Sequence, residues 1–219
     1  MIFFSCTQSS PEIAFEKHAL IFDFKNETAT AEVKLAFFLK MQSEVRRVKK
    51  IELASLQNDC IWTIDNPIIF SEKNGEEWAG ANNIVQHEAF DLSGEYRATF
   101  FDAHDEEVEK TFSVFFPNFL KNANAQEAKE KLLEDAKSMR AFFDEDGRVL
   151  FLGTTEDFEK QTNKRYAYFR DCLFAENIVC LLPIVENENA KRVNENENEN
   201  LQNDESANEK KLADEKPNE

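Results

Sequence analysis

Three histidines are the side chains in this chain best suited to acid–base and metal chemistry at neutral pH. They are His18, His87 and His104, and they lie in different predicted elements. No two of them have the short spacing that places two imidazoles on one face of a helix. The histidines alone therefore predict neither a metal centre nor a catalytic base.

Two acidic segments carry the carboxylates that a calcium ion would need. One is Asp102-Ala103-His104-Asp105-Glu106-Glu107 and the other is Asp144-Glu145-Asp146-Gly147. Calcium takes six or more oxygen ligands, and an EF-hand loop ends in a Glu at its twelfth position. The second segment lacks these further ligands, and the first is typical of a solvated turn. We interpret both segments as turns and predict no metal.

The segment Gly153-Thr154-Thr155 lies between a predicted strand and a predicted helix, where backbone N–H groups can bind phosphate. It has one glycine and no following lysine, so a threonine helix cap is the better interpretation. The sequence also lacks the Gly-x-Ser-x-Gly and His-Glu-x-x-His motifs. We predict no catalytic residue, no cofactor and a non-enzymatic protein.

Three of the four cysteines raise a question of pairing rather than of catalysis. Cys60, Cys172 and Cys180 show no Cys-x-x-Cys spacing. Cys60 alternates with Trp62 and is expected in the core. In an exported protein, Cys172 and Cys180 either form a disulfide or remain buried thiols, and the sequence leaves both alternatives open.

Trp78 is the residue that we predict to contact a partner, because it lies in a predicted loop before Gly80. The alternative is a tryptophan packed under its own loop. The only cationic run is Arg46-Arg47-Val48-Lys49-Lys50. We interpret this run as protection of an edge strand against aggregation, in preference to ligand binding.

The elements that must position these residues follow from apolar spacing. Alternate residues are apolar from Ala31 to Met41, and Leu20, Phe22 and Phe24 share one face in the same way. A period of two is typical of strands buried on one face. The pattern breaks at Lys49-Lys50, which indicates a β-bulge. About seven short strands over residues 12–117 predict an antiparallel β-sandwich.

One motif refines this fold class. The segment Leu92-Ser93-Gly94-Glu95-Tyr96 begins an alternating run and resembles the tyrosine corner of immunoglobulin-like domains. Trp62 lies near the position of the core tryptophan in such domains. The resemblance implies structural roles for Tyr96, Gly94 and Trp62, and it covers about half of the chain. It supports a fold and says nothing of function.

The second half has a different pattern. Apolar residues from Ala125 to Phe143 recur at three and four positions, which predicts a helix capped by Asn124. A short strand over 148–152, a second helix carrying Phe158 and Phe169, and a strand over 178–185 complete a small α/β segment, residues 118–185. Tyr166 and Tyr168 equally suit a strand. Residues 186–219 are rich in Asn and Glu and are predicted to be disordered.

Charge excludes one class of partner. The formal net charge is −17 and the isoelectric point is near 4.7. Such a surface repels phosphate backbones, so we predict no nucleic-acid partner. No apolar stretch is long enough to cross a bilayer as a helix.

The first residues suggest how the chain is attached to a membrane. Met1-Ile2-Phe3-Phe4-Ser5-Cys6 is followed by a polar tether up to Pro11. An apolar run, a small residue and a cysteine resemble the lipobox of bacterial lipoproteins, in the looser form found in spirochaetes. The resemblance implies lipidation of Cys6. The apolar part is shorter than a signal peptide requires, so we expect the true start codon to lie upstream of Met1.

The sequence as a whole predicts four segments: a lipobox-like start and tether (1–11), an immunoglobulin-like β-sandwich (12–117), the small α/β segment (118–185) and the disordered tail (186–219). The predicted function is that of a lipid-anchored protein of the bacterial cell envelope, periplasmic or surface-exposed. Its sandwich would bind an unknown protein or envelope component. The alternatives are an exported hydrolase or carbohydrate-active module with a site in the α/β segment, and a cytoplasmic structural protein.

Overall fold

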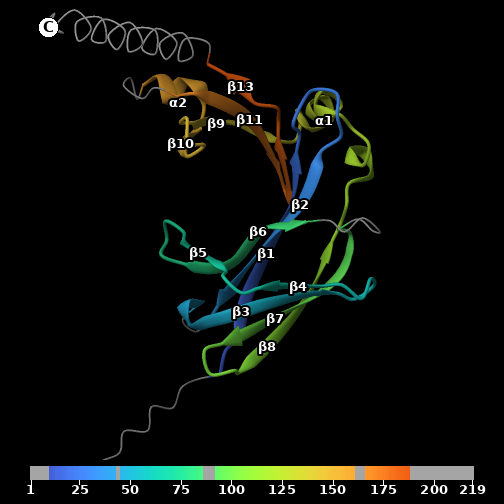
Figure 1. The fold of residues 1–219 in the computed structure, drawn as a ribbon, viewed down its shortest axis with the longest axis vertical. Coiled ribbons are helices and arrows are strands. Elements are labelled where there is room, and N and C mark those ends of the chain that lie inside the picture. Colours follow the sequence, from blue (N-terminus) through green and yellow to red (C-terminus); the bar gives the residue numbers. More distant parts are fainter. Residues whose placement is uncertain (1–9, 43–44, 86–91, 161–165, 188–219) are drawn as a thin grey trace, which may run out of the picture. The chain divides into compact units, whose positions relative to one another are not determined.

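The computed structural model describes residues 10–42, 45–85, 92–160 and 166–187. The fold is mainly β and contains a sandwich-like pair of sheets, as the sequence predicts. The chain forms two compact units: residues 1–137 with 173–182 make the first, and residues 138–172 with 183–219 make the second. Each unit is described by itself (Figure 1). Cys6, His87 and almost all of the predicted tail lie outside the described residues.

One sheet of the first unit has the strand order β12-β1-β2-β6-β5. Its strands are β1 (Ile13–Asp23), β2 (Glu32–Met41), β5 (Ile68–Ser71), β6 (Glu77–Val85) and β12 (Ile178–Leu181). Neighbouring strands are antiparallel, except that β12 runs parallel to β1. The alternation that the sequence predicts for Ala31 to Met41 is therefore that of the strand β2.

The second sheet of this unit has the order β4-β3-β7-β8. Its strands are β3 (Val48–Ser55), β4 (Ile61–Ile64), β7 (Gly94–Asp102) and β8 (Glu107–Val114), all antiparallel to their neighbours. The short 3-10 helix Val45–Arg47 leads into β3. Pairing of β3 with β7 shifts register between Val48 and Lys50, which confirms the predicted bulge.

The core lies between the two sheets and is rich in phenylalanine. Phe37 of β2 stacks on Phe112 of β8 with ring centroids 4.7 Å apart, and Tyr96 of β7 stacks on the same ring. Phe22 of β1 meets Phe116, just after β8, edge to face. Burial of such side chains on the inner faces is what stabilises a sandwich in water.

Tyr96 closes the start of β7 in the way the sequence predicts. Its side chain is fully buried, and its hydroxyl donates a 3.0 Å hydrogen bond to the carbonyl of Leu92. Gly94, at the start of the strand, has φ +126, a conformation that residues with a Cβ rarely adopt. Trp62 is less central than predicted, because it lies partly buried on the edge strand β4 and touches Tyr96 only at a centroid distance of 6.1 Å.

The helix predicted up to Phe143 is wrong beyond its first two turns. Helix α1 covers Ala125–Leu132, capped by Asn124 as predicted, and the next element is the strand β9 (Lys137–Phe143). Ala141 and Phe142 are both buried, so this strand lacks the alternation that would have identified it. The 3-10 helix Asn118–Leu120 precedes α1.

The second unit contains β9, β10 (Val149–Gly153), the short helix α2 (Thr155–Glu159), β11 (Tyr168–Ala175) as far as Cys172, and β13 (Val185–Glu186). Strand β9 lies between β10 and β11, and β13 pairs with β11. The second helix expected around Phe169 is thus a strand, the alternative that Tyr166 and Tyr168 suggested. Phe142 stacks on Phe158 of α2 with centroids 3.8 Å apart, and these rings form the core of the unit.

Candidate functional site

The side of β1 that faces away from β2 is only partly covered. Strand β12 pairs with β1 from Leu20 to Asp23, and no described strand pairs with the preceding residues on that side. Leu20 donates its N–H to the carbonyl of Asn177 there, at 2.8 Å. Backbone groups alternate sides along a strand, so Glu16 and His18 direct their N–H and C=O groups to the same side. These groups form an open edge, which we define as the backbone of residues 16–18.

Two hollows flank this open edge, one on each face of the sheet. The inner hollow has a volume of about 230 Å³ and is mostly apolar; Leu20, Val114, Phe116 and Ile178 are among its lining residues. The outer hollow has a volume of about 540 Å³, and its floor contains the small side chains of Ala19 and Ala36. His18, Glu176 and Asn177 line both hollows. A strand laid along the edge would direct its alternate side chains into them.

His18 is held between the sheets beside the inner hollow. Its ring packs against Phe112 at a centroid distance of 5.1 Å. Burial lowers the pKa of His18 below the ordinary 6.5, although the charge of Glu16 raises it. The imidazole is therefore neutral at neutral pH, and it presents one donor and one acceptor.

Carboxylates lie at both ends of the open edge. Glu16 forms an ion pair with Lys110 of β8 at 3.3 Å. Glu176 lies in the turn between β11 and β12 with φ +39, and no ion pair joins it to a described residue. Phe115 borders the inner hollow with 85% of its surface exposed. The edge thus offers backbone hydrogen bonds, an apolar hollow and one unpaired negative charge.

No local sequence pattern predicts this site. His18 alternates with Leu20 and Phe22, which predicts its inward direction, but Glu176 and Asn177 come from the far end of the chain. Only the parallel pairing of β12 with β1 brings them to His18. The predicted contact residue is elsewhere: Trp78 lies on β6, not in a loop, and is 2% exposed.

Trp78 is therefore no surface contact, and the prediction for it is wrong. The ammonium of Lys17 covers its ring at 4.3 Å from the centroid. Its indole Nε1 is buried and has no hydrogen-bond partner among the described residues. The small residues Ala79, Gly80 and Ala81 follow it, and they hid the alternation of β6 from sequence inspection.

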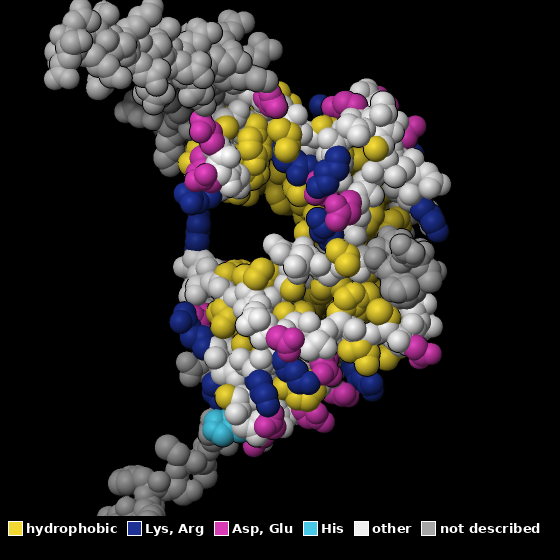
Figure 2. All heavy atoms as spheres, viewed as in Figure 1, with side chains coloured by type: hydrophobic (Ala, Val, Ile, Leu, Met, Phe, Trp, Pro, Cys, Tyr) yellow, Lys and Arg dark blue, Asp and Glu magenta, His cyan; other side chains and the backbone are white. Residues whose placement is uncertain are grey.

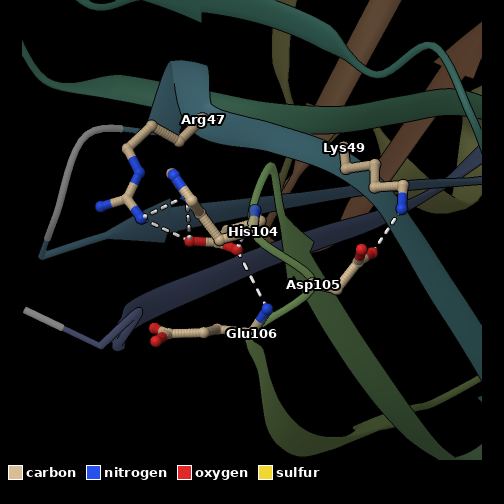
Figure 3. Close-up of polar contacts among 6 residues, drawn as sticks. Arg47, Lys49, His104, Asp105 and Glu106 are labelled. Carbon is tan, nitrogen blue, oxygen red and sulfur yellow. Dashed lines mark hydrogen bonds and ion pairs between the residues drawn. The ribbon is translucent and has the colours of Figure 1, made fainter. Parts of the chain in front are cut away.

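The acidic turn between β7 and β8 is an ionic network (Figure 3). Asp102 is 1% exposed, pairs with Arg47, and accepts hydrogen bonds from the backbone N–H groups of His104 and Glu106 at 2.7 and 3.0 Å. Lys49 pairs with Asp105. No group of three or more potential metal-ligating side chains occurs in the described part of the chain.

The cationic run does not protect an edge strand, because β3 lies between β4 and β7. Each of its charges has an acidic partner: Arg46 pairs with Glu77, Arg47 with Asp102, Lys49 with Asp105 and Lys50 with Glu52. The first three pairs attach β3 and the segment before it to neighbouring elements, whereas Lys50 and Glu52 both lie in β3.

Asp102 should make the stability of the protein depend on pH. Desolvation by burial raises the pKa of Asp102, but the two backbone hydrogen bonds and the charges of Arg47 and His104 lower it more, so that it lies below the ordinary 3.8. The ionised carboxylate therefore stabilises the fold above pH 3.8, and this contribution is lost as the pH falls through the lower folded pKa.

We expect Asp102→Asn to lower the free energy of unfolding at neutral pH, because it removes the charge that Arg47 faces. The difference from the wild type should shrink as the pH falls below the unfolded pKa. Urea denaturation at a series of pH values measures it. A difference that stays constant down to the most acidic pH would contradict this role.

The remaining predicted positions have structural roles. Thr154 caps α2 by accepting a 3.2 Å hydrogen bond from the N–H of Asp157, as the sequence predicts. Asp144 accepts one from the N–H of Arg148 in the turn between β9 and β10. Cys60, Cys172 and Cys180 are free thiols, and burial raises the pKa of Cys180 to about 12. Such a thiol is unreactive at neutral pH.

The second unit contains a bidentate pair of Arg140 with Asp171, at 2.7 and 3.2 Å. The Arg140 guanidinium also lies 3.9 Å from the ring centroid of Phe169. This unit contributes none of the described histidines. No helix in the described part of the chain has both the length and the apolar composition needed to cross a bilayer. Comparison of the chain with protein-family models, curated proteins and solved structures found no match.

Proposed function

We propose that the chain is a non-enzymatic, lipid-anchored protein of the bacterial cell envelope, and that its sandwich binds an extended segment of another envelope protein at the open edge of β1. The observation that carries the binding function is the open edge itself, with a hollow on each face. In strand addition, backbone hydrogen bonds supply affinity and the pockets for alternate side chains supply specificity. Both parts are present at residues 16–18.

The proposal includes an immunoglobulin-like assignment for the sandwich. Strands β1, β2, β6 and β5 correspond in order to A-B-E-D, and β4, β3, β7 and β8 to C′-C-F-G. The hydrogen bond from Tyr96 to Leu92 at the start of β7 supports the same assignment. In this correspondence the open edge belongs to strand A, which β12 covers on its outer side only from Leu20 to Asp23.

The anchor is proposed from the segment Ser5-Cys6 and the polar tether after it. An acyl-glyceryl group with a second acyl chain on Cys6 would bury enough methylene groups for stable attachment. The described domain begins a few residues later, so a domain tethered in this way would remain close to the membrane surface.

The chemistry of the two hollows predicts the segment that would bind. The inner hollow suits one apolar side chain, and Glu176 favours a basic residue near the turn. We therefore expect segments with alternating apolar and polar residues and at least one Lys or Arg. The net charge of −17 would attract a cationic partner further.

The test uses short linear peptides selected from a random library against the folded protein. Ala36 forms part of the floor of the outer hollow, so Ala36→Trp should fill the hollow and weaken peptide binding at least about tenfold. Thr63→Trp is the matched control, because Thr63 is exposed on β4 in the other sheet. Isothermal titration measures both. Equal affinities of the two variants would exclude this site.

One observation favours a second function, that of a hydrolase or carbohydrate-active module. Glu16, Glu176 and His18 line the same outer hollow, and glycoside hydrolysis uses two carboxylates. Against it, the Glu16 carboxylate is already engaged by Lys110 of β8 at 3.3 Å. Hydrolysis of glycoside or ester probes that is abolished in Glu176→Gln would establish the second function in place of the first.

A further inference from the structure

Strand β5 is an edge strand with an unusually apolar surface. It pairs with β6 on one side, and no described strand covers its other side. Ile68, Ile69 and Phe70 are 45%, 39% and 37% exposed. Hydrophobic side chains gather at the surface over this strand (Figure 2). Edge strands are usually protected by charged residues, so three adjacent exposed apolar residues indicate a surface that pairs with another strand.

The backbone of β5 has free groups at two positions. Glu72 donates its N–H to Glu76 on the β6 side, at 2.8 Å. By alternation, Ile69 and Ser71 direct their N–H and C=O groups away from β6. Pro67, two residues earlier, has no N–H to offer. An added strand must therefore match donors and acceptors at Ile69 and Ser71.

We propose that two copies of this chain pair antiparallel through β5, about a two-fold axis at Phe70. This inference goes beyond the proposed function and does not depend on it. In this register Ile69 of each copy lies opposite Ser71 of the other, and both exchange two backbone hydrogen bonds. Phe70 of one copy lies opposite Phe70 of the other. Within each copy, Phe70 packs edge to face on Phe38, with ring centroids 5.1 Å apart. A two-fold interface requires such self-complementarity.

Charge complementarity identifies a second copy as the occupant. Lys73 and Asp65 flank β5 at opposite ends, both are exposed, and neither forms an ion pair with a described residue. The antiparallel arrangement brings the turn after β5 of one copy, which carries Lys73, to the same end of the interface as the bend before β5 of the other copy, which carries Asp65. The axis repeats this contact, which gives two pairs. A parallel arrangement would instead place like charges together.

The interface is small, so we expect a weak and concentration-dependent dimer. Sedimentation velocity of the full chain in reducing buffer, from micromolar to millimolar concentration, should show a monomer–dimer equilibrium. Ile69→Pro removes a donor on the open side and leaves the bonds to β6 intact, so it should weaken dimerisation at least about tenfold. Ile61→Lys is the control, because Ile61 is 63% exposed on β4 in the other sheet.

A charge exchange tests the register even if the proline variant does not fold. Lys73→Glu should weaken the dimer, and adding Asp65→Lys in the same chain should restore it. A wild-type chain that remains monomeric at millimolar concentration would overturn the proposal. The proposal would also fail if the Ile69→Pro variant folds and dimerises with the affinity of the wild type. It would fail as well if the double variant dimerises no more tightly than Lys73→Glu alone. Loss of the dimer on Ile61→Lys would place the interface elsewhere.

Discussion

Gly80→Ala is expected to destabilise the protein more than an alanine substitution at any other glycine of the sandwich. A Cβ at Gly80 of β6 would lie 1.9 Å from the carbonyl oxygen of Phe37 and 2.7 Å from the Cα of Phe38, both backbone atoms of β2. Neither atom can move without shifting the central strand pairing. We expect the free energy of unfolding to fall by about 3 kcal/mol or more. Urea denaturation followed by tryptophan fluorescence measures it.

Gly75→Ala is the matched control. Gly75 lies in the turn between β5 and β6 with φ +83, and an added Cβ would have no neighbour within 4 Å. The cost there is that of the left-handed backbone alone, about 1 kcal/mol. If both variants lose the same free energy of unfolding, the close approach of β2 and β6 at Gly80 would be contradicted.

Cys6→Ser is expected to abolish membrane attachment, because the proposed anchor depends on a single sulfur atom. Expressed from its own gene in its own cells, the wild type should enter the detergent phase of a Triton X-114 extraction and incorporate labelled fatty acid. The variant should remain in the aqueous phase and incorporate none. The effect is all-or-none, since the acyl chains supply the whole affinity for the bilayer.

The control for the anchor is Cys60→Ser, which removes a partly buried thiol from the sandwich and leaves Cys6 in place. It should partition as the wild type does. A wild-type protein found in the aqueous phase, or a Cys6→Ser variant that still carries fatty acid, would remove the anchor from the proposal and favour the cytoplasmic alternative. The binding site at β1 would stand independently.

Much of the sandwich could be predicted because its strands are buried on one face only. The apolar residues of β2 alternate without interruption, and Leu35, Phe37 and Leu39 are fully buried. The bulge in β3 was visible as a break in the same pattern. The structural roles of Gly94 and Tyr96 could also be predicted, because one depends on a backbone conformation that favours glycine and the other on a side-chain hydrogen bond.

The elements that were missed lack this one-sided burial. In β9 the consecutive residues Ala141 and Phe142 are both buried, so the apolar spacing resembled that of a helix. In β5 all four residues are exposed, so no alternation existed to detect. In β6 the small side chains of Ala79 and Gly80 mask the alternation of the strand, so the sequence predicts a loop around Trp78 where the structure has a strand.

The candidate site itself could not be predicted, because it depends on pairing between distant segments. Glu176 and Asn177 reach His18 only through the parallel pairing of β12 with β1. Local pattern says nothing about which strand pairs with which across such a separation. The open edge is defined by where β12 begins, at Ile178, which is a property of the fold and not of the residues around His18.

Amide hydrogen exchange at Glu16 and His18 tests the central claim most directly. In the free protein these two amides should exchange rapidly, while the amide of Leu20, bonded to Asn177, is protected. On saturation with a selected peptide, the Glu16 and His18 amides should become protected, since the peptide backbone would accept their hydrogen bonds. Peptide binding that leaves both amides as exposed as before would contradict strand addition at β1.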